Sequence, residues 1–356
     1  MYVEPKEEEG LLNDLKKQMN QPKLYLCYSI NDFYAREAGI SMLSFLENNP
    51  GYEPEEVFFI DYGISLQNRE RLNEIAARYS RRTTYLDGRP MTTAVKREFP
   101  HLKSWRGTMA PNAKCFVDQI FPDYVERLLF LDADTVVTGS VMELQRMDMS
   151  GAALGVVPAN TTLKRIVFNS GVLLFDLSAW RREGCHEMII STLQKKIYLE
   201  LPDQDLLNHA IPQRLLKPLS PKYNYYMHFF HPRQERTRMH IGNFYTEEEI
   251  EEAIHHPAII HYLAGWIMAR PWHAGCRSSR ADDYLHYKAL SPWKDMPLLA
   301  PYGGITPPFG VRQHIEYWSL KLYSRCPSYQ LVKTTDLCTK AVIYIMDKIR
   351  GNKVTP

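Results

Sequence analysis

Along the first quarter of the chain, continuous apolar runs alternate with segments whose apolar residues recur at helical spacing. Lys23–Ile30 and Glu56–Ile60 are dense in aliphatic and aromatic residues and predict two buried strands, and Thr83–Leu86 predicts a third. Between these runs, apolar residues recur at helical spacing over residues 35–46 and again over 72–79. The order strand, helix, strand, helix, strand is typical of α/β domains with a mostly parallel, doubly wound sheet.

The pattern after residue 86 predicts further strands and helices. Arg127–Val137 is a strong apolar run and predicts one buried strand that carries two acidic residues. Residues 90–110 are mixed and basic and predict a loop, which precedes a helix near 110–121. The other segments predict strands over Ala152–Val157, Phe168–Leu177 and Ala258–Tyr262, helices over 178–197 and Glu247–His256, and irregular chain over 214–245.

The character of the chain changes near residue 296, and this divides it into three parts. Residues 1–22 are charged and predict a leader helix or a frayed tail, and residues 23–295 predict one main domain. The third part is residues 296–356. Within it, residues 301–356 contain eight Lys or Arg and only three acidic residues, and aromatic residues lie between the cations. Such a segment is either a helical appendage packed on the main domain or a surface for peripheral contact with anionic lipid.

The composition narrows the class of protein. Of 356 residues, 45% are hydrophobic and 24% are charged, which is ordinary for a globular protein. A net charge of +2 argues against a nucleic-acid binder. No apolar run reaches the ~18 residues of a membrane-spanning helix, and six scattered cysteines without a CxxC pair argue against a Cys-type zinc site. The acidic N-terminus favours the cytoplasm, or the ER or Golgi lumen if the chain was cut from a longer, anchored one.

The sharpest chemical feature is Asp132-Ala133-Asp134, in the strongest predicted strand. Residues i and i+2 of a strand face the same side, so the carboxylates of Asp132 and Asp134 are expected to lie close together. Two buried carboxylates repel each other and need a cation, and oxygen ligands suit Mg²⁺ or Mn²⁺. Ligands of doubly wound sheets bind beyond the carboxyl ends of the strands, so the residues just after Ile30 are expected at the same site.

Two chemistries use such a pair of acids. In one, a bound metal ion holds a nucleotide diphosphate as the leaving group. The other is that of the haloacid-dehalogenase phosphatases, whose motif is matched locally by Phe130–Val136, with Asp132 as the nucleophile and Asp134 as the acid and base. The motifs in the rest of the chain are needed to distinguish these two chemistries.

Five segments in order resemble glycosyltransferase family 8, the retaining sugar transferases that include glycogenin and bacterial galactosyltransferases. The segments are Leu26–Ala35, Arg127–Val137, Phe168–Leu177, Pro202–Asn208, and His261-Tyr262 with Arg270-Pro271-Trp272. They follow the family's order within residues 23–295, whereas dehalogenase-type motifs usually start near the N-terminus of a domain. The resemblance implies a nucleotide-diphospho-sugar transferase fold of the GT-A type over this range.

The resemblance also implies a UDP-sugar donor and the residues that bind its nucleotide. Tyr34 would stack on the uracil ring. Backbone groups at Ser29 and Ile30, with the side chain of Asn31 or Asp32, would read the edge of the base.

The resemblance implies a metal site next to this loop. Asp132, Asp134 and His261 would hold Mn²⁺, with Mg²⁺ as the second choice, and the metal would stabilise the departing diphosphate. Lys114 and Ala133 would contact the donor beside it.

The closing segment departs from the family pattern. Arg270 stands where the family usually carries Lys, after an insert that begins at Gly265. Because Arg can hold a diphosphate bidentately, both Gly265 and Arg270 are expected among the donor contacts.

The remaining motif residues are expected around the sugar. Asn169 and Ser170 would bind its hydroxyl groups, and Asp203 and Gln204 would lie on the face opposite the leaving group. An uncharged amide is a poor nucleophile, so we expect front-face attack, with Gln204 stabilising the oxocarbenium-like charge and Asp203 holding sugar hydroxyls. Asp is also a good helix N-cap, so Asp203 has a structural alternative.

The expected activity is therefore transfer of a hexose, glucose or galactose, from a UDP-sugar to a hydroxyl acceptor on a carbohydrate, a protein or a lipid-linked molecule. Two alternatives remain at this point. One is the phosphohydrolase that uses Asp132 and Asp134, and the other is a sugar-nucleotide binder without transferase activity.

Overall fold

The computed structural model describes most of the predicted main domain. The described residues are 22–105, 107–158, 166–225, 244–263, 270–276, 278, 280–300 and 338. Nearly all of the predicted leader and of the predicted C-terminal appendage lies outside them. None of the helices in the described ranges is both long and apolar enough to cross a membrane.

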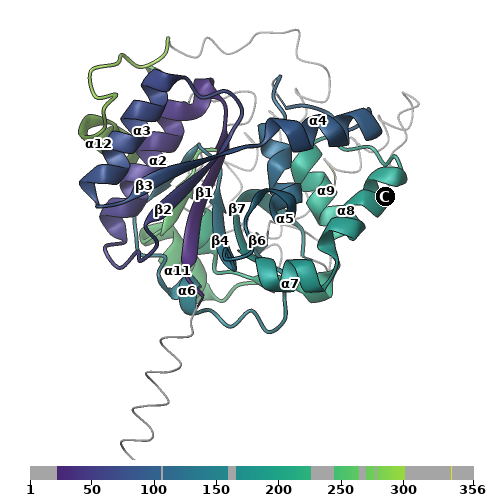
Figure 1. Ribbon diagram of the computed structural model, residues 1–356. Coiled ribbons are helices and arrows are strands. Elements are labelled where there is room, and N and C mark those ends of the chain that lie inside the picture. The colour runs from purple at the N-terminus through teal and green to yellow at the C-terminus, as the bar shows by residue number, and fades with distance from the viewer. Residues whose placement is uncertain are drawn as a thin grey trace, which may run out of the picture.

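A seven-stranded sheet forms the centre of the molecule, with the strand order β3-β2-β1-β4-β7-β6-β8 (Figure 1). Its strands are β1 (Leu24–Ile30), β2 (Glu56–Asp61), β3 (Arg82–Asp87), β4 (Arg127–Leu131), β6 (Leu154–Pro158), β7 (Phe168–Asp176) and β8 (Leu216–Pro218). Strand β7 runs antiparallel to both of its neighbours, and the other pairs are parallel. The predicted α/β class with a mostly parallel sheet is confirmed.

Helices cover both faces of this sheet. Figure 1 shows α2 and α3 on one side and α4, α5, α7, α8 and α9 on the other. The α-helices are α2 (Ala35–Asn48), α3 (Leu66–Arg78), α4 (Arg89–Glu98), α5 (Val117–Ile120), α6 (Glu143–Arg146), α7 (Leu177–Arg182), α8 (Cys185–Gln194), α9 (Pro202–Ala210), α11 (Glu247–His255) and α12 (Ala281–Leu290). Short 3₁₀ turns are η1 (Asp32–Tyr34), η2 (Ala110–Phe116), η3 (Gln213–Leu215) and η4 (Pro221–Asn224).

The central strands are apolar on both faces, which explains their unbroken hydrophobic runs. In β4, Leu129 and Leu131 join the core beneath α2 and α3, whereas Leu128 and Phe130 join the core beneath α7 and α9. A strand buried on both sides reads as a continuous apolar run, as parallel strands commonly do.

The prediction of one strand over Arg127–Val137 is wrong, and the correction concerns the acidic pair. Strand β4 ends at Leu131, and β5 (Thr135–Val137) leaves the main sheet to pair antiparallel with β9 (Ile259–His261). The two acids therefore lie in the turn between β4 and β5, not on one face of a strand. The backbone of this turn is held by Asp132 N–H donating to Gly171 O (2.8 Å) and Tyr262 N–H donating to Asp134 O (2.8 Å).

Three other segments also differ from their predictions. The predicted loop 90–110 contains α4, which has few apolar residues because it buries only Thr92 and Val95. The single helix expected over 178–197 is two helices, α7 and α8, since Gly184 between them adopts a left-handed conformation with φ +69°. Within 214–245, residues 216–218 form strand β8 at the edge of the sheet.

Candidate active site

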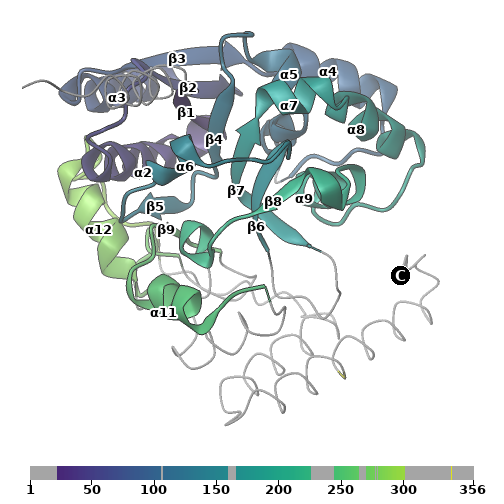
Figure 2. The ribbon, with the colours of Figure 1, turned by 90° about the horizontal axis from the view of Figure 1, so that it is seen from below.

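Two parallel strands end side by side at the edge where the candidate residues gather. Strands β1 and β4 pair in register with Tyr28 opposite Leu131, so the residues after Ile30 and Asp132 leave the sheet at the same edge. In the small sheet, β5 pairs with β9 so that Thr135 lies opposite His261. Strand pairing thus brings a histidine from far along the chain next to the acidic turn; Figure 2 shows β5 and β9 side by side below α2.

Asp132, Asp134 and His261 form one cluster. His261 Nε2 lies 3.1 Å from Asp134 Oδ1 and 4.0 Å from Asp132 Oδ2. One ligand atom from each of the three residues lies within 4.8 Å of the others. The His261 side chain is fully buried, whereas 34% of the Asp132 side chain is exposed, so the cluster is reached from the Asp132 side.

The electrostatics of this cluster suit a cation. Desolvation by the surrounding protein raises the pKa of Asp132 and outweighs the opposing effect of a nearby lysine. Burial alone would raise the pKa of Asp134, but His261 and Arg270 outweigh it and hold that pKa below its ordinary value. Two carboxylates and one imidazole are a mixed oxygen and nitrogen donor set that fits Mn²⁺. Asp132, Asp134 and His261 could therefore hold that ion.

Gly171 in β7 makes room for the histidine. A Cβ atom at this position would lie 2.0 Å from Cε1 and 2.6 Å from Nδ1 of His261. The glycine of the Asn-Ser-Gly strand is thus required by the shape of the cluster. Its backbone also accepts the Asp132 N–H bond, which ties the same point of β7 to the acidic turn.

Lys114 lies behind the acids and joins two of them. Its side chain is buried, and its ammonium group donates to Asp132 Oδ1 (2.8 Å), Ser170 O (3.0 Å) and Asp203 Oδ2 (3.1 Å). Burial would lower the pKa of Lys114, but the Asp132 and Asp203 carboxylates outweigh it and raise that pKa. Because an ammonium has three N–H donors, none is left for a ligand in this conformation.

Asp203 and Gln204 lie in the first turn of α9, next to β7. Ser170 Oγ donates to Asp203 Oδ2 at 2.7 Å, and Asn169 Nδ2 donates to Gln204 Oε1 at 2.9 Å. The N-cap position of α9 belongs to Leu201, so Asp203 does not serve as the helix cap. The buried Ser170 holds Asp203 in place, which leaves Asn169 and Gln204 as the less buried members of this group.

Most polar groups in the loop after β1 form hydrogen bonds within the fold, but one acceptor does not. Ser29 Oγ donates to Ala110 O at 2.7 Å, and Ile30 O accepts the N–H of Tyr62 at 2.9 Å. Asp32 Oδ1 accepts bonds from the residues at the start of α3. By contrast, Asn31 Oδ1 is buried and has no hydrogen-bond partner among the described residues.

The other predicted donor contacts lie near the cluster or outside the described ranges. The half-buried Tyr34 ring packs against the core and meets the Phe33 ring edge-on at 5.0 Å. Ala133 is half-buried between the two acids. Arg270 Nη1 lies 3.3 Å from Asp134 Oδ2. Gly265 falls outside the described residues.

The sequence interpretation missed Asn224, the last residue of η4. This side chain is 2% exposed and lies within hydrogen-bond distance of both His261 and Asn169. The segment around it was predicted as irregular chain, and no motif or spacing signals a contact with residues 169 and 261. A buried polar residue between two tyrosines is the one feature that could have drawn attention to it.

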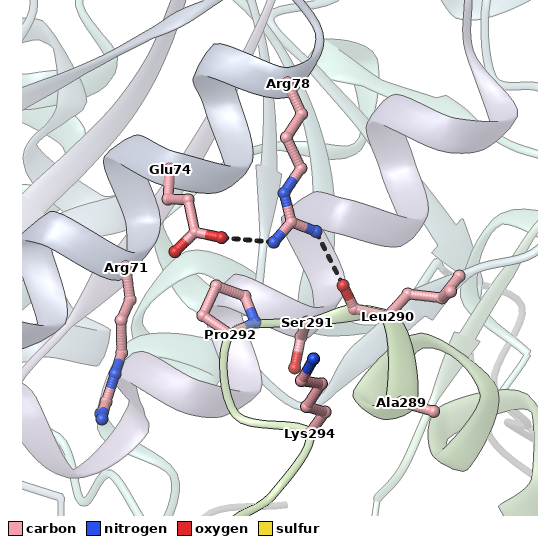
Figure 3. Close-up of a pocket in the computed structure, with 8 residues that line it drawn as sticks. All are labelled: Arg71, Glu74, Arg78, Ala289, Leu290, Ser291, Pro292 and Lys294. Atoms are coloured by element: carbon pink, nitrogen blue, oxygen red, sulfur yellow. Dashed lines mark hydrogen bonds and ion pairs between the residues drawn. The ribbon is translucent and has the colours of Figure 1, made fainter.

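A pocket of about 540 Å³ lies elsewhere, between α3 and the end of α12 (Figure 3). Arg78 spans it by pairing with Glu74 and donating to Leu290 O at 2.7 Å. None of the candidate site residues lines this pocket, so it is separate from the acidic cluster.

Comparison with known proteins relates this chain to sugar transferases. The family profile described as "Glycosyl transferase family 8" matches residues 25–276. General stress protein A of Bacillus subtilis is 22% identical over 76% of this chain and 94% of its own length. A lipopolysaccharide 1,2-glucosyltransferase of Escherichia coli is 25% identical over 76% of this chain and 79% of its own length.

Comparison of structures supports the fold prediction. The galactosyltransferase LgtC, solved in complex with donor and acceptor sugar analogues, superposes with a TM-score of 0.59 at 20% identity. The match covers 75% of this chain and 96% of LgtC. The expected GT-A type of fold is therefore confirmed.

Proposed function

Because this chain belongs to glycosyltransferase family 8, we propose that it is a retaining hexosyltransferase that moves glucose or galactose from a UDP-sugar to a hydroxyl acceptor. The cluster of Asp132, Asp134 and His261 is the observation that carries the proposal. A carbohydrate acceptor is favoured because a relative is named as a lipopolysaccharide glucosyltransferase. The catalytic unit would be residues 23–295, with 296–356 as the proposed appendage.

The metal-binding part of the proposal rests on the geometry of the cluster. Asp132, Asp134 and His261 would hold Mn²⁺, which when bound supplies Lewis-acid stabilisation to the diphosphate leaving group. Arg270 approaches the cluster from the side of Asp134, with Nη1 lying 3.3 Å from Asp134 Oδ2. Its guanidinium group can turn from Asp134 to a diphosphate, since a carboxylate and a phosphate group each offer two oxygens to parallel N–H donors.

The state of Gln204 supports attack from the front face. Gln204 Oε1 accepts hydrogen bonds from Asn169 Nδ2 (2.9 Å) and from the Ser170 N–H (3.4 Å), so both of its lone pairs are used. An amide oxygen held in this way is a poor nucleophile, but its dipole still stabilises positive charge that develops on the sugar. Asp203, neutralised by Lys114, would hold sugar hydroxyls beside it.

Asn31 supports uracil as the base of the donor. Its Oδ1 is a buried acceptor without a partner among the described residues, and an unsatisfied buried acceptor is costly. The N3–H group of uracil is a donor, whereas N3 of cytosine is an acceptor. Asn31 Oδ1 would therefore accept from uracil, with Tyr34 stacked on the ring.

The phosphohydrolase alternative is not favoured. The family match runs through all five motifs, whereas the dehalogenase resemblance is limited to one local segment around Asp132. Asp132, the nucleophile in that alternative, pairs with Lys114 at 2.8 Å. The other alternative, a sugar-nucleotide binder without transferase activity, would bind UDP but would not cleave UDP from any UDP-sugar.

A donor and product experiment tests the proposal. The full chain is incubated with Mn²⁺ and UDP-glucose, UDP-galactose, GDP-mannose or CMP-sialic acid, together with a glycoside acceptor. Release of UDP from a UDP-hexose and an NMR spectrum showing an α-linked product from the α-linked donor are expected. A β-linked product would contradict retention, and phosphate release from a simple phosphomonoester would favour the hydrolase.

A further inference from the structure

Asn224 connects the two halves of the candidate site. One side of its amide lies 3.0 Å from His261 Nδ1, and the other lies 3.1 Å from Asn169 Oδ1. Asn169 in turn bonds to Gln204. A chain of side-chain amides therefore runs from the metal cluster to the residue proposed to face the sugar.

A backbone group fixes the orientation of the first amide in this chain. The Gly171 N–H lies 2.9 Å from one terminal atom of Asn169, and an N–H can only donate, so that atom must be the oxygen. The nitrogen of Asn169 then points to Gln204. The Gln204 atom that it meets also lies 3.4 Å from the Ser170 N–H, so this atom must be an oxygen as well.

The same reasoning determines the state of the histidine. Because Asn169 Oδ1 is an acceptor, the Asn224 atom that faces it must be the NH₂ group, and Asn224 Oδ1 must face His261. An acceptor at 3.0 Å from Nδ1 requires the proton of the neutral ring to sit on Nδ1. The lone pair of the ring is then on Nε2, which lies 3.1 Å from Asp134 Oδ1.

We propose that Asn224 is a positioning residue that holds His261 in the metal-binding tautomer and links the metal cluster to Gln204 through Asn169. The inference rests on the proposed function. His261 Nε2 and Asp134 Oδ1 face each other at 3.1 Å, a contact that a proton or a metal ion can bridge, and the chain of amides leaves Nε2 as the ring nitrogen that is available to a metal. Groups that orient a ligating histidine typically change metal affinity 10–100-fold when they are replaced.

Two substitutions of nearly the same shape separate this role from simple packing. Asn224→Leu removes the acceptor for His261 Nδ1–H and the donor to Asn169. Asn224→Asp keeps the acceptor for His261 but turns a carboxylate oxygen toward Asn169 Oδ1, so only the link to Gln204 is lost. A matched control is Asn49→Leu, because Asn49 is a 1% exposed amide that donates to Phe45 O and accepts from the N–H of Val141, away from the cluster.

The readout is the affinity for Mn²⁺ alone, measured by calorimetry on the full chain and its variants. Asn224→Leu is expected to weaken Mn²⁺ binding about 10–100-fold. Asn224→Asp is expected to bind Mn²⁺ as tightly as the parent or tighter, while its kcat for UDP release falls about tenfold at unchanged KM. Asn49→Leu is expected to lose thermal stability and keep its Mn²⁺ affinity.

Several results would overturn this inference. Parent-like Mn²⁺ affinity in Asn224→Leu would do so, as would a loss of affinity in Asn224→Asp of more than tenfold. If Asn224→Leu does not fold, the Asp variant still decides the question. A parent chain that binds no Mn²⁺ would instead overturn the proposed function, and this inference with it.

Discussion

Replacing Gly171 with alanine places a methyl group against the most buried residue of the candidate metal site. The new Cβ would lie 2.0 Å from Cε1, 2.6 Å from Nδ1 and 2.9 Å from Nε2 of His261. Carbon atoms in contact stay about 3.5 Å apart, so the ring must move by roughly 1.5 Å. The ring is fully buried between Asn224 and Asp134, so this movement breaks bonds on both sides.

The expected cost has two parts. Overpacking of a buried site destabilises the fold by about 1–3 kcal/mol. A metal site tolerates displacements of only about 0.5 Å, so a shift of the ring by roughly three times that distance removes His261 as a ligand. Mn²⁺ is expected to raise the melting temperature of the parent, and Gly171→Ala is expected both to lower the melting temperature and to abolish that rise.

Gly39→Ala is the matched control. Its Cβ would lie 2.4 Å from Cζ3 of the buried Trp293, a clash of similar severity between α2 and the chain after α12. This variant is expected to lose stability as well, but to keep its response to Mn²⁺. Parent-like Mn²⁺ affinity in Gly171→Ala, or loss of the Mn²⁺ response in Gly39→Ala as well, would contradict a specific role of Gly171 in placing His261.

Two further predictions concern the charge pair and the nucleotide loop. Lys114→Met leaves Asp132 and Asp203 without the buried cation that they share. The variant is expected to lose about 3–5 kcal/mol of unfolding free energy, measured by urea titration at neutral pH. A loss below about 1 kcal/mol would contradict the pairing. Tyr34→Ala is expected to raise the KM for the UDP-sugar about tenfold with kcat unchanged, because base stacking contributes about 1–3 kcal/mol, and an unchanged KM would exclude stacking.

The sequence predicted those strands and helices whose own residue pattern is sufficient to identify them. The strands β1, β2 and β4 are buried on both faces, so their apolar runs identify them without knowledge of their partners. Helix α4 was missed because it buries only two side chains, which leaves its pattern too polar to differ from a loop. The acidic turn was read as strand because apolar residues flank it on both sides and pair in two different sheets.

The residues of the candidate site could be predicted only where they belong to a recognisable sequence motif. The acidic pair was predicted from its position after an apolar run and His261 from the family resemblance, and the structure brings the three residues together through the pairing of β5 and β9. Lys114 was expected to contact the donor, but its burial and its two carboxylate partners depend on η2 packing against β1 and α9, which no local pattern reports. Asn224 lies 37 positions before His261 and 55 after Asn169, so only the folded arrangement reveals that its side chain contacts both.

A metal titration of the parent and Asp134→Asn shows whether the reaction depends on a metal ion held by the acidic cluster. UDP release from the preferred UDP-hexose is measured after chelation and then at increasing Mn²⁺ concentrations. We expect chelation to abolish UDP release in the parent and Mn²⁺ to restore it. We expect Asp134→Asn to lose at least 100-fold in activity at the same Mn²⁺ concentration, which corresponds to about 2.7 kcal/mol of transition-state stabilisation. Full activity in the chelated parent or in Asp134→Asn would contradict this dependence on a metal ion.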